Sequence, residues 1–317
     1  MHCAQGQQKP GAEHMVAEIV QANDRDGGRA GRGSSGNHEW SILWGAASVA
    51  HTSNKGCQLV KLLSAIIPSR SQPQQVGFLQ RSIKSIAEQR ARAVVDIEVI
   101  VGIDPGETPP DIGPTDVPVR FVTGQQRLQA AALNAAAAAS RGDYIAFIED
   151  DDVWLPDHLL MALHMLAQQA GFVSGTQLEV DPSGNVIRIN DFPTPSGWVM
   201  LRSTWETVGP FDETYRYHLD NDWLGRLAKA GIDRIHIVEA TAPVDAAALE
   251  VRPWLVNIAV AGGGRVRLAR HSLPVPLVTR LVHPASGVHA IKNDPSVTVK
   301  SRAEIARLEA AYGRIPW

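Results

Sequence analysis

The chain has 317 residues, of which 44% are hydrophobic and 20% charged, so it is long enough to bury one large core or two smaller ones. Thirty Lys and Arg residues against 33 Asp and Glu residues leave a formal net charge of -3, which excludes a bulk electrostatic footprint for nucleic acid or an anionic membrane surface. Its two cysteines, Cys3 and Cys57, support neither a disulfide framework nor a thiolate metal site, and no apolar run approaches the roughly 20 residues that cross a bilayer. We therefore expect a cytoplasmic protein without a transmembrane segment.

Residues 1–57 have a different composition from the rest of the chain. They are rich in Gly, Gln, Ser and Asn, so ordering them would gain little apolar burial against the entropy cost. We predict that they form a mobile N-terminal extension. Two other interpretations stay open: Trp40 and Trp44 dock a short helix onto the body, or this stretch is written upstream of the true start codon.

Residues 58–156 alternate between short apolar runs and segments with helical spacing. The pattern predicts strands over residues 62–67, 97–103, 119–122 and 144–148, and helices over residues 76–89 and 126–140. Pro68 is expected to stop the first strand. Alternating strands and helices indicate a mainly parallel sheet.

Residues 157–240 continue with a mixed pattern. We predict helices over residues 156–169 and 223–230 and strands over residues 172–180 and 186–189. Asp220 and Asp222 open the second of these helices, so that one of them is expected to cap it while the other projects into a cleft. Residues 241–317 are expected to form a C-terminal tail with a lid and a helix.

Polar side chains follow three of the predicted strands. Arg70, Asp104 and the run Glu149-Asp150-Asp151-Asp152 each come directly after a strand, and in parallel sheets ligands bind beyond the carboxyl ends of the strands. Four adjacent carboxylates repel one another, and a hard divalent cation such as Mn²⁺ or Mg²⁺ stabilises such a cluster. The alternative is a solvated acidic turn that caps the following helix.

Each further candidate residue has a functional and a structural interpretation. Asp104 could accept hydrogen bonds from a nucleobase or ribose, or form the turn before Pro105. Arg70 could contact a phosphate or the base, or be solvated, and Trp198 could stack on a sugar or base, or belong to the core. The tail histidines could close over a diphosphate or lie at the surface; they are His271, His283 and His289.

Together these residues resemble the inverting family-2 glycosyltransferases of the GT-A fold, from about residue 64 to residue 231. Residues 65–70 look like the family's opening strand and loop, residues 129–134 like its Ala-Arg-Asn helix, and residues 142–156 like its metal segment. The resemblance implies a GT-A-like α/β fold, a nucleotide-diphospho-sugar transferase with a three-layer α/β/α sandwich around a mainly parallel sheet. Residues 58–240 would be this domain, with a nucleotide-sugar half at 58–156 and an acceptor half at 157–240.

The resemblance also implies roles for individual residues. The family's Asp-x-Asp signature maps to Glu149-Asp150-Asp151, and residues 282–287 look like a His-Pro-Gly-Ser segment that reaches the metal or diphosphate. The expected metal ligands are Glu149, Asp150, Asp151 and His283. The expected donor-binding residues are Pro68, Arg70, Asp104, Asp150 and Trp198. The expected catalytic residues are Asp220, as general base, and Asp222.

Three positions depart from the family pattern. Ser69-Arg70 replaces an aromatic-Asn pair, Ile103 replaces one of two paired aspartates, and Leu219 replaces the acidic residue before the base. The first two lie on the expected donor side, so the sequence leaves the sugar and the nucleotide open.

The function expected from the resemblance is metal-dependent transfer of a sugar, with inversion, in polysaccharide or glycoconjugate biosynthesis. The expected partners are a nucleotide-diphosphate sugar donor and a carbohydrate or other hydroxyl acceptor, with no nucleic acid; a homo-oligomer is compatible with the sequence. Two alternatives remain open here. One is a retaining transferase or nucleotidyltransferase on a similar sheet, and the other is a non-catalytic nucleotide-sugar-binding protein.

Overall fold

A computed structural model describes residues 61–240, 266–284 and 286–317, all of which belong to one unit, Val60–Trp317. The predicted N-terminal extension, residues 1–57, lies outside the described residues, as does the part of the tail at 241–265. Among the described residues, no helix is both long enough and apolar enough to cross a membrane.

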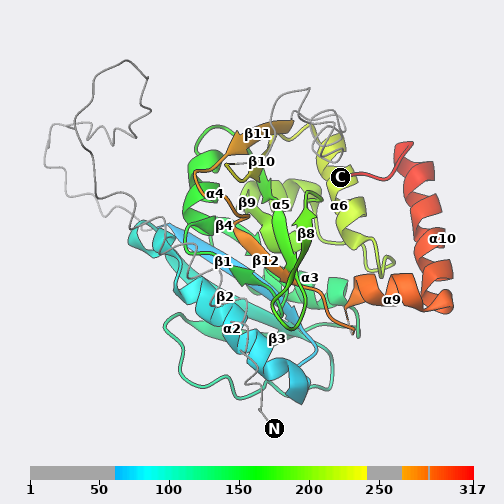
Figure 1. Cartoon of the computed structure of the whole chain (residues 1–317), viewed down its shortest axis with the longest axis horizontal. Helices are drawn as coiled ribbons and strands as arrows, with labels where there is room; N and C mark the ends of the chain where they lie inside the picture. The colour runs from blue at the N-terminus through cyan, green and yellow to red at the C-terminus, as the bar shows by residue number, and fades with distance from the viewer. Residues whose placement is uncertain (1–60, 241–265, 285) are drawn as a thin grey trace, which may run out of the picture. The chain divides into compact units, whose positions relative to one another are not determined.

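The nucleotide-side strands form the parallel half of an eight-stranded sheet (Figure 1). β1 (Leu62–Ser69) pairs with β2 (Asp96–Ile103) on one side and with β4 (Tyr144–Phe147) on the other, and β2 pairs with β3 (Val119–Thr123). All three pairings are parallel, as the alternation of strands and helices predicts. The carboxyl ends of these strands therefore lie at one edge of the sheet.

The sheet continues through a strand that the sequence analysis did not predict. β9 (Trp198–Leu201) lies between β4 and β6 (Phe172–Gly175) and is antiparallel to both. Beyond β6, β10 (Arg234–Val238) and β11 (Val266–Arg270) pair in parallel, so the strand order is β11-β10-β6-β9-β4-β1-β2-β3. The mainly parallel central sheet is thus confirmed, with one antiparallel strand inside it.

A second, four-stranded sheet has the order β5-β12-β7-β8. Its strands are β5 (Val153–Trp154), β7 (Gln177–Val180), β8 (Val186–Asn190) and β12 (Val278–Leu281). The single strand expected over residues 172–180 is therefore two strands that belong to different sheets. The change occurs at Thr176, whose N–H still donates to Ile237 of the first sheet while its hydroxyl donates to Glu239 (2.7 Å).

Helices cover both faces of the central sheet. Residues of α3 (Gln129–Ala139), α5 (Arg202–Val208), α6 (Leu219–Lys229) and α10 (Pro295–Tyr312) share one buried apolar cluster with the strands. α2 (Val76–Ala87) and α4 (His158–Leu166) contribute no residue to that cluster, and α4 contacts β6 and β9. The remaining helical segments are η1 (Pro73–Gln75), η2 (Arg90–Ala93), η3 (Pro195–Gly197) and α9 (Gly287–Asn293). This is the expected three-layer α/β/α arrangement.

Two predicted boundaries are corrected. β1 continues through Pro68 to Ser69, because β4 pairs with β1 only as far as Ile66, and a proline is tolerated where one side of a strand is unpaired. α6 begins at Leu219 rather than at residue 223, and His218 holds its N-cap position. Asp220 and Asp222 therefore both lie inside the first turn, and neither caps the helix.

Gly102 lets α3 pack directly against β2. A Cβ at this position would lie 2.0 Å from the backbone oxygen of Ala132, whereas a Cβ at Gly77 in α2 would meet nothing within 4 Å. We expect Gly102→Ala to lower the free energy of unfolding by about 3 kcal/mol, since backbone cannot yield as a side chain can. Gly77→Ala should stay within about 1 kcal/mol of wild type. Urea unfolding of both variants checks this, and an unchanged midpoint for Gly102→Ala would contradict the packing described.

Candidate active site

An acidic loop, Glu149–Asp152, follows the carboxyl end of β4. The Ile148 N–H donates to the Ile66 carbonyl (3.1 Å), which keeps the chain beside β1 until the loop begins. Carboxylate oxygens of Glu149, Asp151 and Asp152 lie within 4.8 Å of one another. None of them caps α4, whose N-cap residue is Asp157. The cluster has the oxygen donors that Mn²⁺ or Mg²⁺ takes, so the residues fit such an ion.

Asp152, which the expected ligand set omitted, anchors this loop to the rest of the fold. Its side chain is fully buried, one oxygen accepts from the Ser196 hydroxyl (2.5 Å), and the other accepts from the Leu281 N–H (3.0 Å). The Ser196 hydroxyl also accepts from the Glu149 N–H (3.1 Å). Asp152 therefore fixes the loop against β12 and η3, while its neighbours Glu149, Asp150 and Asp151 are only partly buried.

Asp150 has an unsatisfied oxygen. Burial raises the pKa of its carboxyl to about 7, the negative charge of Asp151 adds to this rise, and a hydrogen bond from Ser69 opposes it. Its Oδ2 atom is buried and has no hydrogen-bond partner. A buried carboxylate oxygen without a partner is costly, so this atom is a place where a cation or a donor hydroxyl would be stabilised.

The ends of β1 and β2 bring Arg70 and Asp104 together beside this loop. Arg70 is exposed and directly follows the carboxyl end of β1, and Asp104 directly follows the carboxyl end of β2. Burial raises the pKa of Asp104, while the charges of Arg127 and Arg70 oppose that rise. The charge of Arg70 also acts on Asp150. Pro68, an expected donor-binding residue, is buried within β1. The loop that begins at Arg70 follows it.

The tail brings His283 to the acidic loop across 132 residues of sequence. His283 Nε2 lies 2.9 Å from Asp151 Oδ2, and its ring packs against Phe78 with centroids 5.8 Å apart. The hydrogen bond to Asp151 raises the pKa of His283, although burial opposes it. His271, by contrast, lies in a small cavity with His158 and burial lowers its pKa to about 4.

A buried arginine that sequence reasoning missed compensates part of the acidic charge. Arg280 of β12 has a side chain that is only 14% exposed and forms an ion pair with Glu179 (3.2 Å). Burial lowers the pKa of Arg280, but the negative charges of Glu149 and Asp152 outweigh it and raise the pKa. Nothing in the local sequence around residue 280 distinguishes it from other tail arginines. Gln129, the first residue of α3, also donates to Glu149 (3.1 Å).

Asp220 in the first turn of α6 is the expected general base. Burial raises the pKa of its carboxyl, whereas the charge of His218 and the N–H of Asn221 oppose that rise. Its negative charge also raises the pKa of Glu149, so the two carboxylates lie within electrostatic reach. A raised pKa makes this carboxylate a stronger base than a solvated aspartate, which suits a proton acceptor.

Asp222, the second expected catalytic residue, has a different environment from Asp220. It is 6% exposed, and both carboxylate oxygens are occupied, because Oδ2 accepts from Arg226 (2.9 Å) and Oδ1 accepts from Tyr312 (2.8 Å). These contacts join α6 to α10 and to its own next turn, which gives Asp222 a structural role.

Trp198, an expected donor-binding residue, lies in the core of this structure. Its side chain is fully buried, its indole N–H donates to Pro193, and its ring lies 5.1 Å from the Trp223 ring and 5.3 Å from the Phe172 ring, centroid to centroid. This environment favours the alternative that the sequence analysis left open, that Trp198 belongs to the core. The strand that carries Trp198 was not predicted from the sequence.

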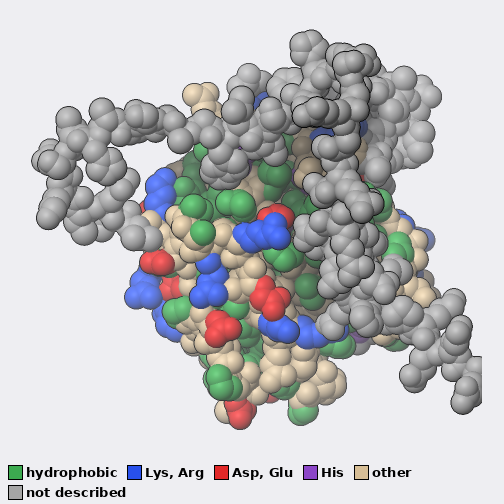
Figure 2. Space-filling view, turned by 60° about the vertical axis from the view of Figure 1, so that its left-hand side comes forward, with side chains coloured by type: hydrophobic (Ala, Val, Ile, Leu, Met, Phe, Trp, Pro, Cys, Tyr) green, Lys and Arg blue, Asp and Glu red, His purple; other side chains and the backbone are tan. Residues whose placement is uncertain are grey.

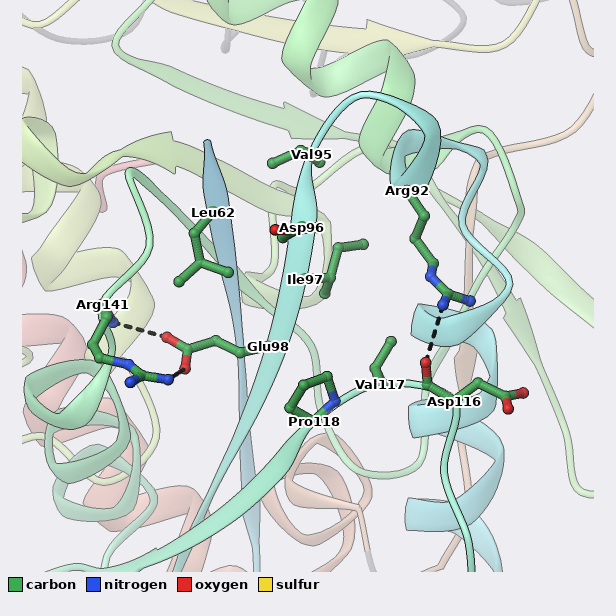
Figure 3. Close-up of a pocket in the computed structure, with 10 residues that line it drawn as sticks. All are labelled: Leu62, Arg92, Val95, Asp96, Ile97, Glu98, Asp116, Val117, Pro118 and Arg141. Atoms are coloured by element: carbon green, nitrogen blue, oxygen red, sulfur yellow. Dashed lines mark hydrogen bonds and ion pairs between the residues drawn. The ribbon is translucent and has the colours of Figure 1, made fainter. Parts of the chain in front are cut away.

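One pocket among the described residues lies away from the acidic loop. It has a volume of about 340 Å³ and is lined from the beginnings of β1 and β2, with Leu62, Ile97 and Pro118 among its residues (Figure 3). Glu98 in this pocket already accepts from Ser64 (2.8 Å) and Arg141 (3.0 Å). Because β1, β2 and β4 are parallel, this pocket and the acidic loop are at opposite ends of the sheet.

The surface carries no broad patch of one charge on the face seen in Figure 2. There, acidic and basic side chains of the described residues are interspersed. This distribution agrees with the net charge of -3, and a bound anion would have to be held by local groups such as Arg70.

A family model described as glycosyl transferase family 2 matches residues 64–225, just over half of the chain. S. aureus TarS 1-349 in complex with UDP is 11% identical, with a TM-score of 0.46, covering 79% of this chain and 72% of that chain. The corresponding complex with UDP-GlcNAc is 11% identical, with a TM-score of 0.47, covering 79% and 73%. No curated protein matches the chain.

Proposed function

The chain belongs to glycosyl transferase family 2, and on that premise we propose that it transfers a sugar from a nucleotide-diphosphate sugar to an acceptor hydroxyl with inversion at the anomeric carbon. The observation that carries the proposal is the meeting of the acidic loop, Arg70 and Asp104 at one edge of the sheet, with Asp220 within electrostatic reach. These groups follow the ends of three neighbouring strands. The carboxylates suit the ribose and a metal ion, and the guanidinium suits the diphosphate.

We propose that Glu149 and Asp151 hold Mn²⁺ or Mg²⁺, with His283 as a further ligand once its proton is lost. Their oxygens belong to a cluster within 4.8 Å, and the unpartnered Oδ2 of Asp150 lies in the same loop. A divalent cation there would supply Lewis-acid stabilisation of the negative charge on the diphosphate. Asp152 and Ser196 keep the loop in place, and Arg280 limits the repulsion among its carboxylates.

The donor side of the proposal rests on the loop ends of β1 and β2. Asp104 is partly buried beside the positive charge of Arg70, an arrangement that would let the carboxylate accept from the base or ribose while the guanidinium contacts a phosphate. The partly buried surroundings of Asp104 strengthen such hydrogen bonds relative to water. We propose Asp150 as the neighbour of the ribose.

On the acceptor side, Asp220 would accept the proton of the attacking hydroxyl. The acceptor oxygen forms a bond to the anomeric carbon as the bond from that carbon to the diphosphate breaks, and the proton passes to the carboxylate of Asp220. A single displacement inverts the anomeric centre. We propose a structural role for Asp222, whose carboxylate contacts Arg226 and Tyr312.

A donor screen tests the proposal directly. Thermal unfolding is measured with Mn²⁺ and, one at a time, UDP-glucose, UDP-GlcNAc, GDP-mannose, dTDP-glucose and CDP-glucose. A donor at 100 times its Kd should stabilise the protein by about 2.7 kcal/mol, and EDTA should remove most of that gain. Release of nucleoside diphosphate from the same donor would separate an enzyme from a binding protein, and product stereochemistry would separate inverting from retaining transfer. Failure of the whole panel to bind would count against the proposal.

A further inference from the structure

The loop that leads into α6 is held by a carboxylate of the C-terminal helix. Glu304 of α10 is 8% exposed and accepts three consecutive backbone N–H groups, from Arg216 (2.8 Å), Tyr217 (2.9 Å) and His218 (3.0 Å). A carboxylate that accepts several N–H groups forms strong, charge-assisted hydrogen bonds. Residues 216–218 are therefore tied to α10.

The first turn of α6 depends on the same helix. His218 is the N-cap residue but makes no side-chain cap; its Nε2 lies 2.8 Å from the Ser301 hydroxyl and its Nδ1 lies 3.1 Å from Asn221 Oδ1. The side-chain nitrogen of Asn221 donates to the Pro316 carbonyl (2.7 Å), so the atom that faces His218 is the Asn221 oxygen Oδ1, which accepts. The Nδ1 atom of His218 must therefore carry the proton of this hydrogen bond. The residue before α6 and the third residue of α6 are thus both held by side-chain contacts to α10 or to the residues after it.

The contact between the C-terminal segment and α6 continues along the next turns. Tyr312 donates to Asp222 (2.8 Å), and a Cβ added at Gly225 would lie 2.6 Å from the Tyr312 ring and 2.9 Å from Pro316. Figure 1 shows α10 running alongside α6. Gly225 lets the two segments approach this closely, so α6 is fixed along its length as well as at its start.

We infer that Glu304 is a positioning residue for Asp220, and this inference rests on the proposed role of Asp220 as the base. Asp220 is the second residue of α6, between His218 and Asn221, both of which bond to the C-terminal segment. The contacts given for Glu304 reach the backbone before the helix and not the Asp220 carboxylate. Loss of Glu304 should therefore change where the base points without removing the base, and small displacements of a reacting group can cost large factors in rate.

The test compares Glu304→Gln with Glu309→Gln, an exposed residue on the same helix. Nucleoside diphosphate release is followed with each donor of the panel and Mn²⁺, with water as the acceptor that gives its proton to the base. We expect kcat of Glu304→Gln to fall by about 10- to 100-fold, with the donor KM and the number of donor sites unchanged. Hydrogen exchange at the amides of Arg216, Tyr217 and His218 should accelerate. Glu309→Gln should match wild type in all of these.

Several outcomes would overturn the inference. Faster exchange at residues 216–218 with wild-type kcat would mean that the loop does not aim the base. A parallel loss of kcat and donor sites would mean that Glu304 only maintains the fold. If Glu304→Gln does not fold, Glu304→Asp keeps the charge but draws the carboxylate back from the amides of residues 216–218, and a wild-type kcat with faster exchange at those amides would count equally against the inference. A wild-type protein that hydrolyses no donor would refute the proposed function itself, and the inference with it.

Discussion

Asp220→Asn is expected to lower kcat by roughly 10² to 10⁴ while the donor affinity stays nearly constant. The substitution keeps the shape of the side chain and a hydrogen-bonding oxygen but removes its ability to accept a proton. Burial raises the pKa of the Asp220 carboxyl, opposed by His218, and a base acts in its ionised form. Wild-type kcat should therefore rise with pH through that raised pKa, and this rise should be absent from Asp220→Asn. Donor hydrolysis over a pH series, with calorimetric titration of the donor, measures both effects.

Asp222→Asn is the matched control, two residues along the same helix. It weakens the contacts to Arg226 and Tyr312, so it should reduce the free energy of unfolding by about 1–3 kcal/mol and leave kcat near the wild-type value in the folded protein. If a folded Asp222→Asn protein is the inactive one, the base is misassigned by two positions. If both variants remain active, the proposed inverting mechanism is wrong.

Asp151→Ala is expected to abolish the metal-dependent part of donor binding. The change removes one carboxylate from the cluster with Glu149 and Asp152, the same carboxylate that His283 contacts, so the cation would be underligated and the diphosphate charge uncompensated. Calorimetric titration of the donor with and without Mn²⁺ measures the effect. The affinity of the variant should be the same in both conditions.

Asp96→Ala serves as the control for that experiment, because Asp96 is an exposed aspartate at the opposite end of the sheet, beside the pocket of Figure 3. It should keep the full dependence of donor affinity on Mn²⁺. A metal-dependent affinity that survives in Asp151→Ala would show that the acidic loop is not the metal site. Loss of that dependence in both variants would point to a general loss of structure, which thermal unfolding would detect.

The sequence by itself determined the parallel half of the fold and the place of the site. β1, β2 and β4 are short apolar runs separated by helical segments, and such alternation leaves few arrangements other than parallel strands with helices on both faces. Once the strands are parallel, the residues that follow them must meet at one edge. The meeting of Arg70, Asp104 and the acidic loop at this edge was predictable for that reason, whereas Asp220 became the proposed base only through the family resemblance.

Only the tertiary structure decided which residues the other half of the chain brings to that edge. β9 has no strong local signal and exists because β4 and β6 pair with it from both sides, and the same pairing buries Trp198. Arg280 and His283 reach the acidic loop from β12 and the residues after it, and Glu304 reaches the start of α6 from the last helix. These contacts join residues more than 80 positions apart, and their energies depend on burial and on partners that no local pattern contains.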